Sequence, residues 1–542
     1  MAFSVGINVT KTERVYRKTP TQEEQTVPLS LLDATTANFA LTNAVWLFER
    51  PEINDAFDVA EHLRQTLSTA LDSYPQWCGE LKSINVVDDA AVATEAKGFP
   101  AHARRFGRVY SRFGASVDVG VDFIAATNSS TLDSLYPTER TEKQPLWNRK
   151  DDKLSNFVPS SEIAHALQPN EPYAATGLRK PLMAIQCTTL ACGGFVLAIK
   201  TAHPLADISS LVRFVQDWAS ISRAVIGGST PPLPSPVFEP ARLDKLAAGD
   251  INADQPDLAI MRHVEGLPLH RYDWWAAPGK PPAPLLDETR PLPPAGKAMP
   301  WAEWDVKAPV SDYTVHLDRE QVEFLWKEST KGGEGVGVRI SKHDAVLAHI
   351  WSCIMRARQL GKDNDPVHCD LVLGVRSALK LGDAFMGSPI IMMNIEMTGA
   401  EVSSVEAGQA TGALVPIARR IRETVATVSS PANLAAHLHS AAYEKSPQRI
   451  WQAFLGRRHI LVTTWARAGI YDVDFGLGSR IRYADGVVPN LDGNILIKEA
   501  PPSSGGSASG SWTDGGVDLS VHICTEDMER LLQDPLLLPP RM

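Results

Sequence analysis

Apolar positions along the chain follow two different spacings, one typical of helices and one typical of buried strands. Helical spacing occurs in the segments 59–71, 341–360 and 526–532. Short apolar runs rich in β-branched residues, which predict strands, occur at 193–201, 367–375 and 517–523. Because both periodicities recur throughout the chain, we expect an α/β or α+β fold.

This pattern is interrupted by a proline-rich stretch between residues 227 and 309. Proline lacks an amide donor and fixes φ, so the stretch as a whole cannot form a regular helix or a central strand, and we expect a crossing segment with a short helix or two. We therefore expect an N-terminal domain over residues 1–226 and a C-terminal domain over 310–542, joined by this crossover segment. Its four tryptophans favour a segment that packs over a disordered tether; they are Trp274, Trp275, Trp301 and Trp304.

Composition narrows the classes of protein that fit. The chain has 542 residues, of which 44% are hydrophobic and 21% charged, and this ordinary globular mix excludes a disordered or fibrous chain. The net charge of −10, without a basic cluster, argues against a nucleic-acid partner. No apolar run reaches the ~20 residues of a membrane span and no secretory leader is visible, so we expect a cytoplasmic protein. The six scattered cysteines predict neither a disulfide framework nor a metal site.

The strand predicted at 193–201 leads directly into the pentapeptide HPLAD, which begins at His203 and ends at Asp207. An amphipathic helix is expected immediately after it. An isolated HxxxD pattern is short and common, and by itself it indicates a packed histidine and an aspartate that caps a helix. A neutral imidazole displayed at the end of a strand can also serve as a general base.

Seven stretches in a fixed order extend this local pattern over most of the chain. They are VPLSLLDA (27–34), YPQWCGEL (74–81), HPLAD (203–207), VLAHIWSCIMRAR (346–358), VRSALKLGDAFMGSP (375–389), TTWARAGIYDVDFGLG (463–478) and DGGVDLSVHICTEDMERLL (514–532). Each resembles a motif of the BAHD superfamily, the plant and fungal CoA-dependent acyltransferases. The chain matches the plant versions of these motifs only weakly, and in this respect it resembles the fungal branch of the superfamily. No single match is specific, but seven in order are.

The resemblance implies both a fold and a reaction. The fold is two chloramphenicol-acetyltransferase-like domains, each a mixed sheet with helices, with a channel between them for CoA and acceptor. His203 matches the catalytic histidine. Asp207 matches an aspartate that holds the loop through an arginine, for which Arg376 is our candidate. An acyl-CoA, acetyl-CoA by default, would be the co-substrate. No metal and no permanently bound cofactor are implied.

Two further motif residues concern the substrates. Thr463 and Trp465 match positions that line the acyl and acceptor site. A threonine hydroxyl can donate to the oxyanion of a tetrahedral intermediate. For Trp465, simple core packing is an equally good explanation.

The C-terminal motif also contains a loop with paired glycines. Asp474, Gly476 and Gly478 match the DFGWG loop, whose aspartate is sometimes described as a second acid or base. The glycines favour a tight turn that the carboxylate fixes. Leu477 replaces the family's tryptophan, so we expect altered local packing. The segment GDAFMGSP lacks the tyrosine and asparagine that surround the family's glycine, so acceptor preference is expected to differ.

These observations predict an acyl-CoA-dependent O-acyltransferase that acts on a hydroxyl of a small secondary metabolite. Transfer would be direct, in a ternary complex, and the enzyme would be a monomer. An N-acyltransferase with an amine acceptor stays open. So does a stand-alone condensation or chain-release enzyme, although such domains usually carry HHxxxDG and here Ala202 and Ile208 flank the motif. A catalytically silent binding protein of the same fold is the alternative from another class.

Overall fold

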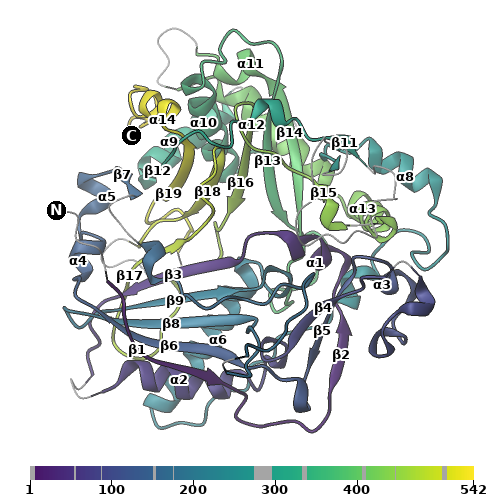
Figure 1. Cartoon of the computed structure of the whole chain (residues 1–542). Coiled ribbons are helices and arrows are strands. Elements are labelled where there is room, and N and C mark those ends of the chain that lie inside the picture. Colours follow the sequence, from purple (N-terminus) through teal and green to yellow (C-terminus); the bar gives the residue numbers. More distant parts are fainter. Residues whose placement is uncertain are drawn as a thin grey trace.

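The structure is a computed structural model that describes residues 6–53, 57–86, 88–149, 154–174, 176–273, 296–331, 339–405, 411–445, 447–502 and 510–541. Two mixed β-sheets with packed helices form the centre of the molecule, one in the lower and one in the upper half of Figure 1. The fold class predicted from the sequence, α/β with two sheet-and-helix units, is therefore confirmed.

The first sheet belongs mainly to the N-terminal half. Its strand order is β1 (Asn8–Val15), β6 (Val121–Asn128), β8 (Met183–Leu190), β9 (Phe195–Thr201), β3 (Thr42–Phe48) and β17 (Ile481–Gly486). All neighbouring pairs are antiparallel except β6 and β8. Helices α2 (Val59–Ala70) and α6 (Ile208–Ile226) contribute their apolar faces to the core of this sheet.

The second sheet belongs mainly to the C-terminal half. Its order is β14 (Ile390–Thr398), β13 (Pro366–Gly374), β16 (His459–Thr464), β18 (Asn494–Glu499), β19 (Val517–Cys524), β12 (Val310–Leu317) and β7 (Leu146–Asn148). The three adjacent strands β13, β16 and β18 are parallel. The core of this sheet is closed by α9 (Arg319–Thr330), α10 (Lys342–Ala357), α12 (Leu414–Val428) and α14 (Thr525–Leu532). As predicted, Ser341 and Asp344 form the capping box of α10.

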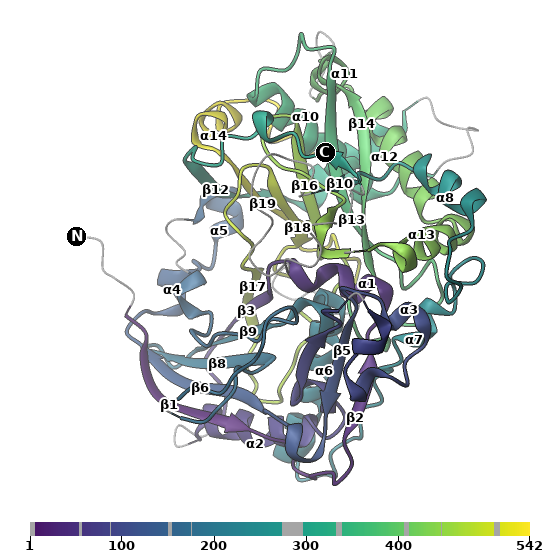
Figure 2. The same cartoon turned by 45° about the vertical axis from the view of Figure 1, so that its right-hand side comes forward.

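Each sheet receives one strand from the other half of the chain. Strand β17 pairs with β3 in the first sheet, and β7 pairs with β12 in the second. Lys498 of β18 reaches β17, where its ammonium donates to the hydroxyl of Tyr483, so the exchanged strand lies where the two sheets meet (Figure 2). This exchange interlocks the two halves. The boundaries proposed at residues 226/227 and 309/310 stay a prediction.

The remaining elements form smaller layers. Two further sheets are β2 (Gln25–Pro28), β5 (Val109–Phe113) and β4 (Glu80–Ser83), and β11 (Lys297–Ala298), β10 (Tyr272–Asp273) and β15 (Ile450–Trp451). The remaining helices are α1 (Leu31–Thr35), α3 (Ala101–Arg104), α4 (Leu132–Leu135), α5 (Arg140–Lys143), α7 (Ala241–Asp244), α8 (Leu258–Glu265), α11 (Gly399–Ser403) and α13 (Pro431–Tyr443). Among the helices described, none is both long and apolar enough to cross a bilayer.

The described ends of the crossover segment pack as expected. Trp301 and Trp304 stack with an interplanar angle of 10°, and both rings meet the ring of Phe454 edge-on. Trp274 and Trp275 lie outside the described residues. The two short helices α7 and α8 occur where proline is less dense, within the predicted irregular stretch.

Candidate active site

His203 lies between the end of β9 and the start of α6. Strand β9 ends at Thr201, and His203–Leu205 form a single 3₁₀ turn in which Pro204 is buried. Asp207 then caps α6, because its carboxylate accepts the backbone N–H of Ser210. The strand–turn–helix arrangement predicted for HPLAD is therefore present, and it places the imidazole at the rim of the first sheet.

Arg376 binds the carboxylate of Asp207 with two hydrogen bonds. Nη1 donates to Oδ2, and Nη2 lies 2.9 Å from Oδ1. The two side chains are only 11% and 9% exposed. The ion pair proposed from the sequence is thus formed, and Arg376 engages both carboxylate oxygens of Asp207. Because Arg376 follows β13, this buried pair joins the two halves of the molecule.

A second contact between the halves lies beside this pair. Gly387 forms an isolated parallel bridge with Ala206, and its carbonyl accepts the backbone N–H of Asp207. The same carbonyl accepts from Ser210 Oγ and from Arg376 Nη2. The His203 turn is therefore held from the second half by both backbone and side-chain hydrogen bonds.

Ser388 fixes the orientation of the His203 ring. The hydroxyl of Ser388 donates its proton to the backbone carbonyl of His203, and its oxygen lies 3.1 Å from His203 Nδ1. A serine hydroxyl has one proton, so Nδ1 must be the donor in the second contact. This assigns the Nδ1–H tautomer and leaves the lone pair of the imidazole on Nε2.

The N-terminal motif VPLSLLDA supports Ser388 in turn. The carboxylate of Asp33 accepts the backbone N–H of Ser388 at 2.6 Å and also accepts from Ser30 at the start of α1. Burial raises the pKa of Asp33 to about 7. Gly387 has φ +116°, and a Cβ there would lie 2.8 Å from Asp33 Oδ1, so only glycine fits.

The surroundings keep His203 neutral. Burial lowers its pKa below the ordinary value of 6.5, with the charge of Asp207 acting in the opposite direction. The ring of Phe39 approaches the imidazole edge-on with 5.7 Å between centroids. A neutral imidazole with a free Nε2 can remove a proton from an acceptor hydroxyl or amine.

Thr463 and Trp465 have different environments. Thr463 is half-buried near the end of β16, and its hydroxyl has no hydrogen-bond partner among the described residues. Trp465 is 6% exposed and belongs to the core of the N-terminal half, where a Cβ on Gly486 would lie 2.6 Å from its ring. The structure therefore leaves Thr463 available to a ligand and accounts for Trp465 by packing.

The DFGLG loop is a tight turn. Asp474 Oδ1 accepts the N–H of Gly476 at 2.8 Å. Gly476 and Gly478 have φ of +77° and +69°, a conformation in which glycine is not strained. Leu477 is 1% exposed in the core of the N-terminal half, so at this position leucine packs where the family has tryptophan.

This loop contacts the far end of α6. The backbone carbonyl of Asp474 accepts from Arg223, and that of Phe475 accepts from Ser222. Asp474 and Gly478 line an open cleft of about 1120 Å³, and His203 is not among the described residues that line it. A 19-residue α-helix is about 28 Å long, so α6 separates Asp474 from His203 by most of that length.

Sequence reasoning missed several of these relations. Ser388 and Asp33 lie in two of the seven motif stretches, 375–389 and 27–34. Nothing in either stretch indicates a contact with His203, which is 185 residues from Ser388 in the sequence. Three histidines that cluster in the second half, His270, His368 and His459, were also missed. They come from separate segments without any short-range spacing, so the sequence contains no metal-type pattern for them.

Comparison with known proteins gives one family and several relatives. A family model described as "Transferase family" matches residues 5–98, 116–261 and 275–538. The acyltransferase AFT15-1 of Alternaria alternata is 26% identical over 514 residues, covering 92% of this chain and 90% of that protein. The acyltransferase abl6 of Leptosphaeria maculans is 24% identical and covers 98% of both chains.

A solved structure shows the same fold. TRI101 of F. graminearum, complexed with coenzyme A and deoxynivalenol, superimposes with a TM-score of 0.65. The match covers 95% of this chain and 98% of that chain at 14% sequence identity. The similarity extends over both sheets, as expected if the two halves form one catalytic unit.

Proposed function

This chain belongs to the Transferase family, as the BAHD-type motifs predicted, and we propose that it is an O-acyltransferase that acylates a hydroxyl of a small secondary metabolite. It is an acyltransferase, and the family's co-substrate is an acyl-CoA; acetyl is the proposed acyl group. The observation that carries the proposal is the His203 imidazole. Burial lowers its pKa, Ser388 holds it through Nδ1, and its Nε2 has no hydrogen-bond partner among the residues that the structure describes.

The proposed reaction needs no enzyme nucleophile. Nε2 of His203 accepts the proton of the acceptor hydroxyl as its oxygen attacks the thioester carbonyl. The tetrahedral intermediate collapses with cleavage of the C–S bond, and the proton passes from Nε2 to the thiolate of CoA. Thr463 donates a hydrogen bond to the oxyanion. Holding both substrates in one complex supplies much of the rate.

Relatives support a small-molecule acceptor. Two of them bear the name acyltransferase, and the solved TRI101 structure contains coenzyme A together with deoxynivalenol. An amine acceptor is the second candidate, because a neutral imidazole can also accept the proton that a neutral amine loses as it attacks the thioester. We further propose that the enzyme works as a monomer in the cytoplasm, which light scattering and fractionation would check.

Acyl transfer can be tested directly. The protein is incubated with acetyl-CoA and a panel of alcohols and amines, and the CoA thiol released is measured with and without each acceptor. Acceptor-dependent thiol release from acetyl-CoA supports the proposal, and mass spectrometry of the product distinguishes an ester from an amide. A binding protein without activity would retain CoA but release no thiol with any acceptor.

The order of events is tested by initial rates. Lines that intersect at several fixed acceptor concentrations indicate a ternary complex. Parallel lines, or an acyl adduct on the protein in the absence of acceptor, would indicate a covalent intermediate instead. A condensation or chain-release enzyme would use an acyl group presented on a carrier protein in preference to free acyl-CoA.

A further inference from the structure

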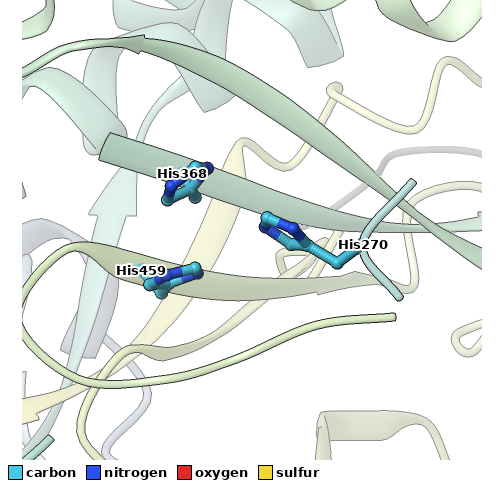
Figure 3. Close-up of side chains that lie close together, drawn as sticks. All are labelled: His270, His368 and His459. Atoms are coloured by element: carbon cyan, nitrogen blue, oxygen red, sulfur yellow. The ribbon is translucent and has the colours of Figure 1, made fainter. Parts of the chain in front are cut away.

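Three histidines from distant segments meet on one face of the second sheet. His368 lies in β13, His459 in β16, and His270 in the segment just before β10 (Figure 3). One ring nitrogen from each residue lies within 4.8 Å of those of the other two. The ring centroids are 4.3 Å apart for His368 and His459, and 4.8 Å and 5.4 Å from His270 to these two.

The sheet register brings two of the rings together. His368 and His459 are directly paired on adjacent parallel strands, so their side chains project from the same face. That face is opposite to Ile460 and Val462, which enter the helix-covered core. The third ring, that of His270, is held beside the sheet by a backbone hydrogen bond two residues earlier, in which the carbonyl of Pro268 accepts the N–H of Asn394 on β14.

A buried carboxylate lies beside the three rings. Asp370 is fully buried; its Oδ2 lies 3.2 Å from His459 Nδ1 and accepts the N–H of Phe454. Its Oδ1 lies 3.2 Å from His270 Nε2. Asp370 Oδ1 and His270 Nε2 are both buried, and neither makes a hydrogen bond of good geometry with any described residue. Buried polar atoms left in this state are costly, and a bound ion would satisfy them.

The outer contacts hold the rings in place. His368 Nδ1 lies 3.0 Å from Asn394 Oδ1, and His459 Nδ1 contacts Asp370. Metal-binding histidines usually engage an oxygen with the nitrogen that does not bind the ion, which fixes the ring orientation.

We propose that His270, His368 and His459 form a binding site for a divalent first-row transition metal, with Zn²⁺ as the best-suited ion and with Asp370 as the buried carboxylate that orients the rings. Imidazole nitrogens match the ligands of zinc and exclude Mg²⁺ and Ca²⁺, which require oxygen ligands. Zinc–nitrogen bonds are about 2.0–2.1 Å, so the rings close inward by a small shift on binding.

The site has a structural task. It ties the part of the crossover segment that carries His270 to the parallel strands β13 and β16 of the second sheet. His459 and Thr463 project from the same face of β16, four residues apart, or about 13 Å at strand spacing. The metal therefore stabilises the framework of the acyl-transfer site without contacting the reacting atoms, and the inference does not depend on the proposed reaction.

The test measures metal content and stability in the full-length protein. After incubation with Zn²⁺ and removal of free metal, wild type should retain about one equivalent per chain, because three protein ligands and a water complete the tetrahedral coordination of zinc. A chelator should lower the melting temperature, and Zn²⁺ should restore it. Co²⁺ loading should give the visible absorption of a histidine-bound ion. The chosen variants are His368→Gln and Asp370→Asn, with His62→Gln as the control, since His62 is a half-buried histidine that contacts Ser222.

The outcomes are distinct. His368→Gln should abolish retained zinc, and Asp370→Asn should weaken zinc affinity by about 10–100-fold. His62→Gln should bind zinc like wild type. If wild type retains no zinc and gives no Co²⁺ spectrum, or if His368→Gln retains as much zinc as wild type, the site does not exist. If a variant fails to fold, the wild-type protein still tests the site, because zinc retention, chelation and reloading are all measured on wild type.

Discussion

The two ends of helix α6 carry the two most recognisable motifs of the chain, and they differ in almost every physical respect. At the N-terminal end, the HPLAD turn is buried and held by Arg376, Ser388 and the backbone of Gly387. At the C-terminal end, the DFGLG loop contacts α6 through backbone carbonyls, and the Asp474 carboxylate serves its own turn. Both motifs therefore specify a precise local geometry. In HPLAD this geometry orients a histidine that we propose to be the catalytic base, and in DFGLG it forms a tight turn.

The difference also supports the proposal that one histidine acts alone. Burial lowers the pKa of His203 and Ser388 fixes one tautomer, as a general base would need, while the nearby carboxylate of Asp207 is occupied by Arg376. Asp474 contacts α6 at Arg223, about 22 Å along the helix from Ile208. The predictions that follow test this contrast between the two ends.

The largest effect is expected at the N-terminal end. His203→Ala should lower kcat by about 10²–10⁴-fold, because it removes the base, while the circular dichroism spectrum stays unchanged. His62→Ala, which removes a histidine packed near the opposite end of α6, serves as the control and should leave kcat close to wild type. Near-normal turnover of His203→Ala would contradict the mechanism.

Breaking the buried ion pair should reduce both stability and activity. Asp207→Ala or Arg376→Met alone leaves an uncompensated buried charge, which typically costs about 3–5 kcal/mol. Chemical denaturation measures this loss. The double variant should be more stable than the sum of the two single losses implies. Loss of activity at unchanged stability would instead indicate that Asp207 takes part in the chemistry.

Ser388 should affect activity through His203. Ser388→Ala removes the hydroxyl that donates to the His203 carbonyl and accepts from Nδ1. The hydrogen bond to the ring is worth about 0.5–1.5 kcal/mol, so we expect kcat to fall about two- to tenfold. Because the tautomer is no longer fixed, the acidic limb of the kcat/KM profile should also move. Ser388→Thr keeps the hydroxyl and should restore both readouts. A fall in stability with an unchanged pH profile would assign Ser388 a structural role only.

The pH profile tests the burial of His203. Protonation inactivates a general base, and burial lowers the pKa of this imidazole below 6.5. The rate should therefore stay level as the pH falls through 6.5 and decrease only at lower pH. The pH dependence of kcat/KM reports the free enzyme. An acidic limb centred above 6.5 would mean that the imidazole is more solvated, or more strongly paired with a negative charge, than the structure shows.

The smallest effect is expected at the C-terminal end. Asp474→Asn keeps an oxygen that can accept from Gly476, so kcat should stay near wild type and stability should fall by less than about 1 kcal/mol. A decrease in kcat as large as that of His203→Ala would show that Asp474 takes part in the reaction, and the two ends of α6 would then not differ in function.

Sequence patterns predicted local features well and contacts between the halves poorly. The strand, turn and helix around HPLAD, and the capping box of Ser341 and Asp344, are determined by neighbouring residues, so short-range rules suffice. Arg376 was found because a motif pointed to it. Ser388 on His203, and the three clustered histidines, depend on how distant segments meet, which periodicity does not encode. The exchanged strands β7 and β17 were missed for the same reason.

The exchange of β17 also has a consequence for synthesis of the chain. Arg480, just before β17, pairs with Glu49, just after β3, and 431 residues separate them. A ribosome adds about 5–20 residues per second, so the edge of β3 waits on the order of 20–90 s for its partner strand. An open strand edge is a template for wrong pairing with other chains. The nascent N-terminal half is therefore most exposed to aggregation in this interval, and slow translation or a shortage of chaperones should reduce the yield of folded enzyme.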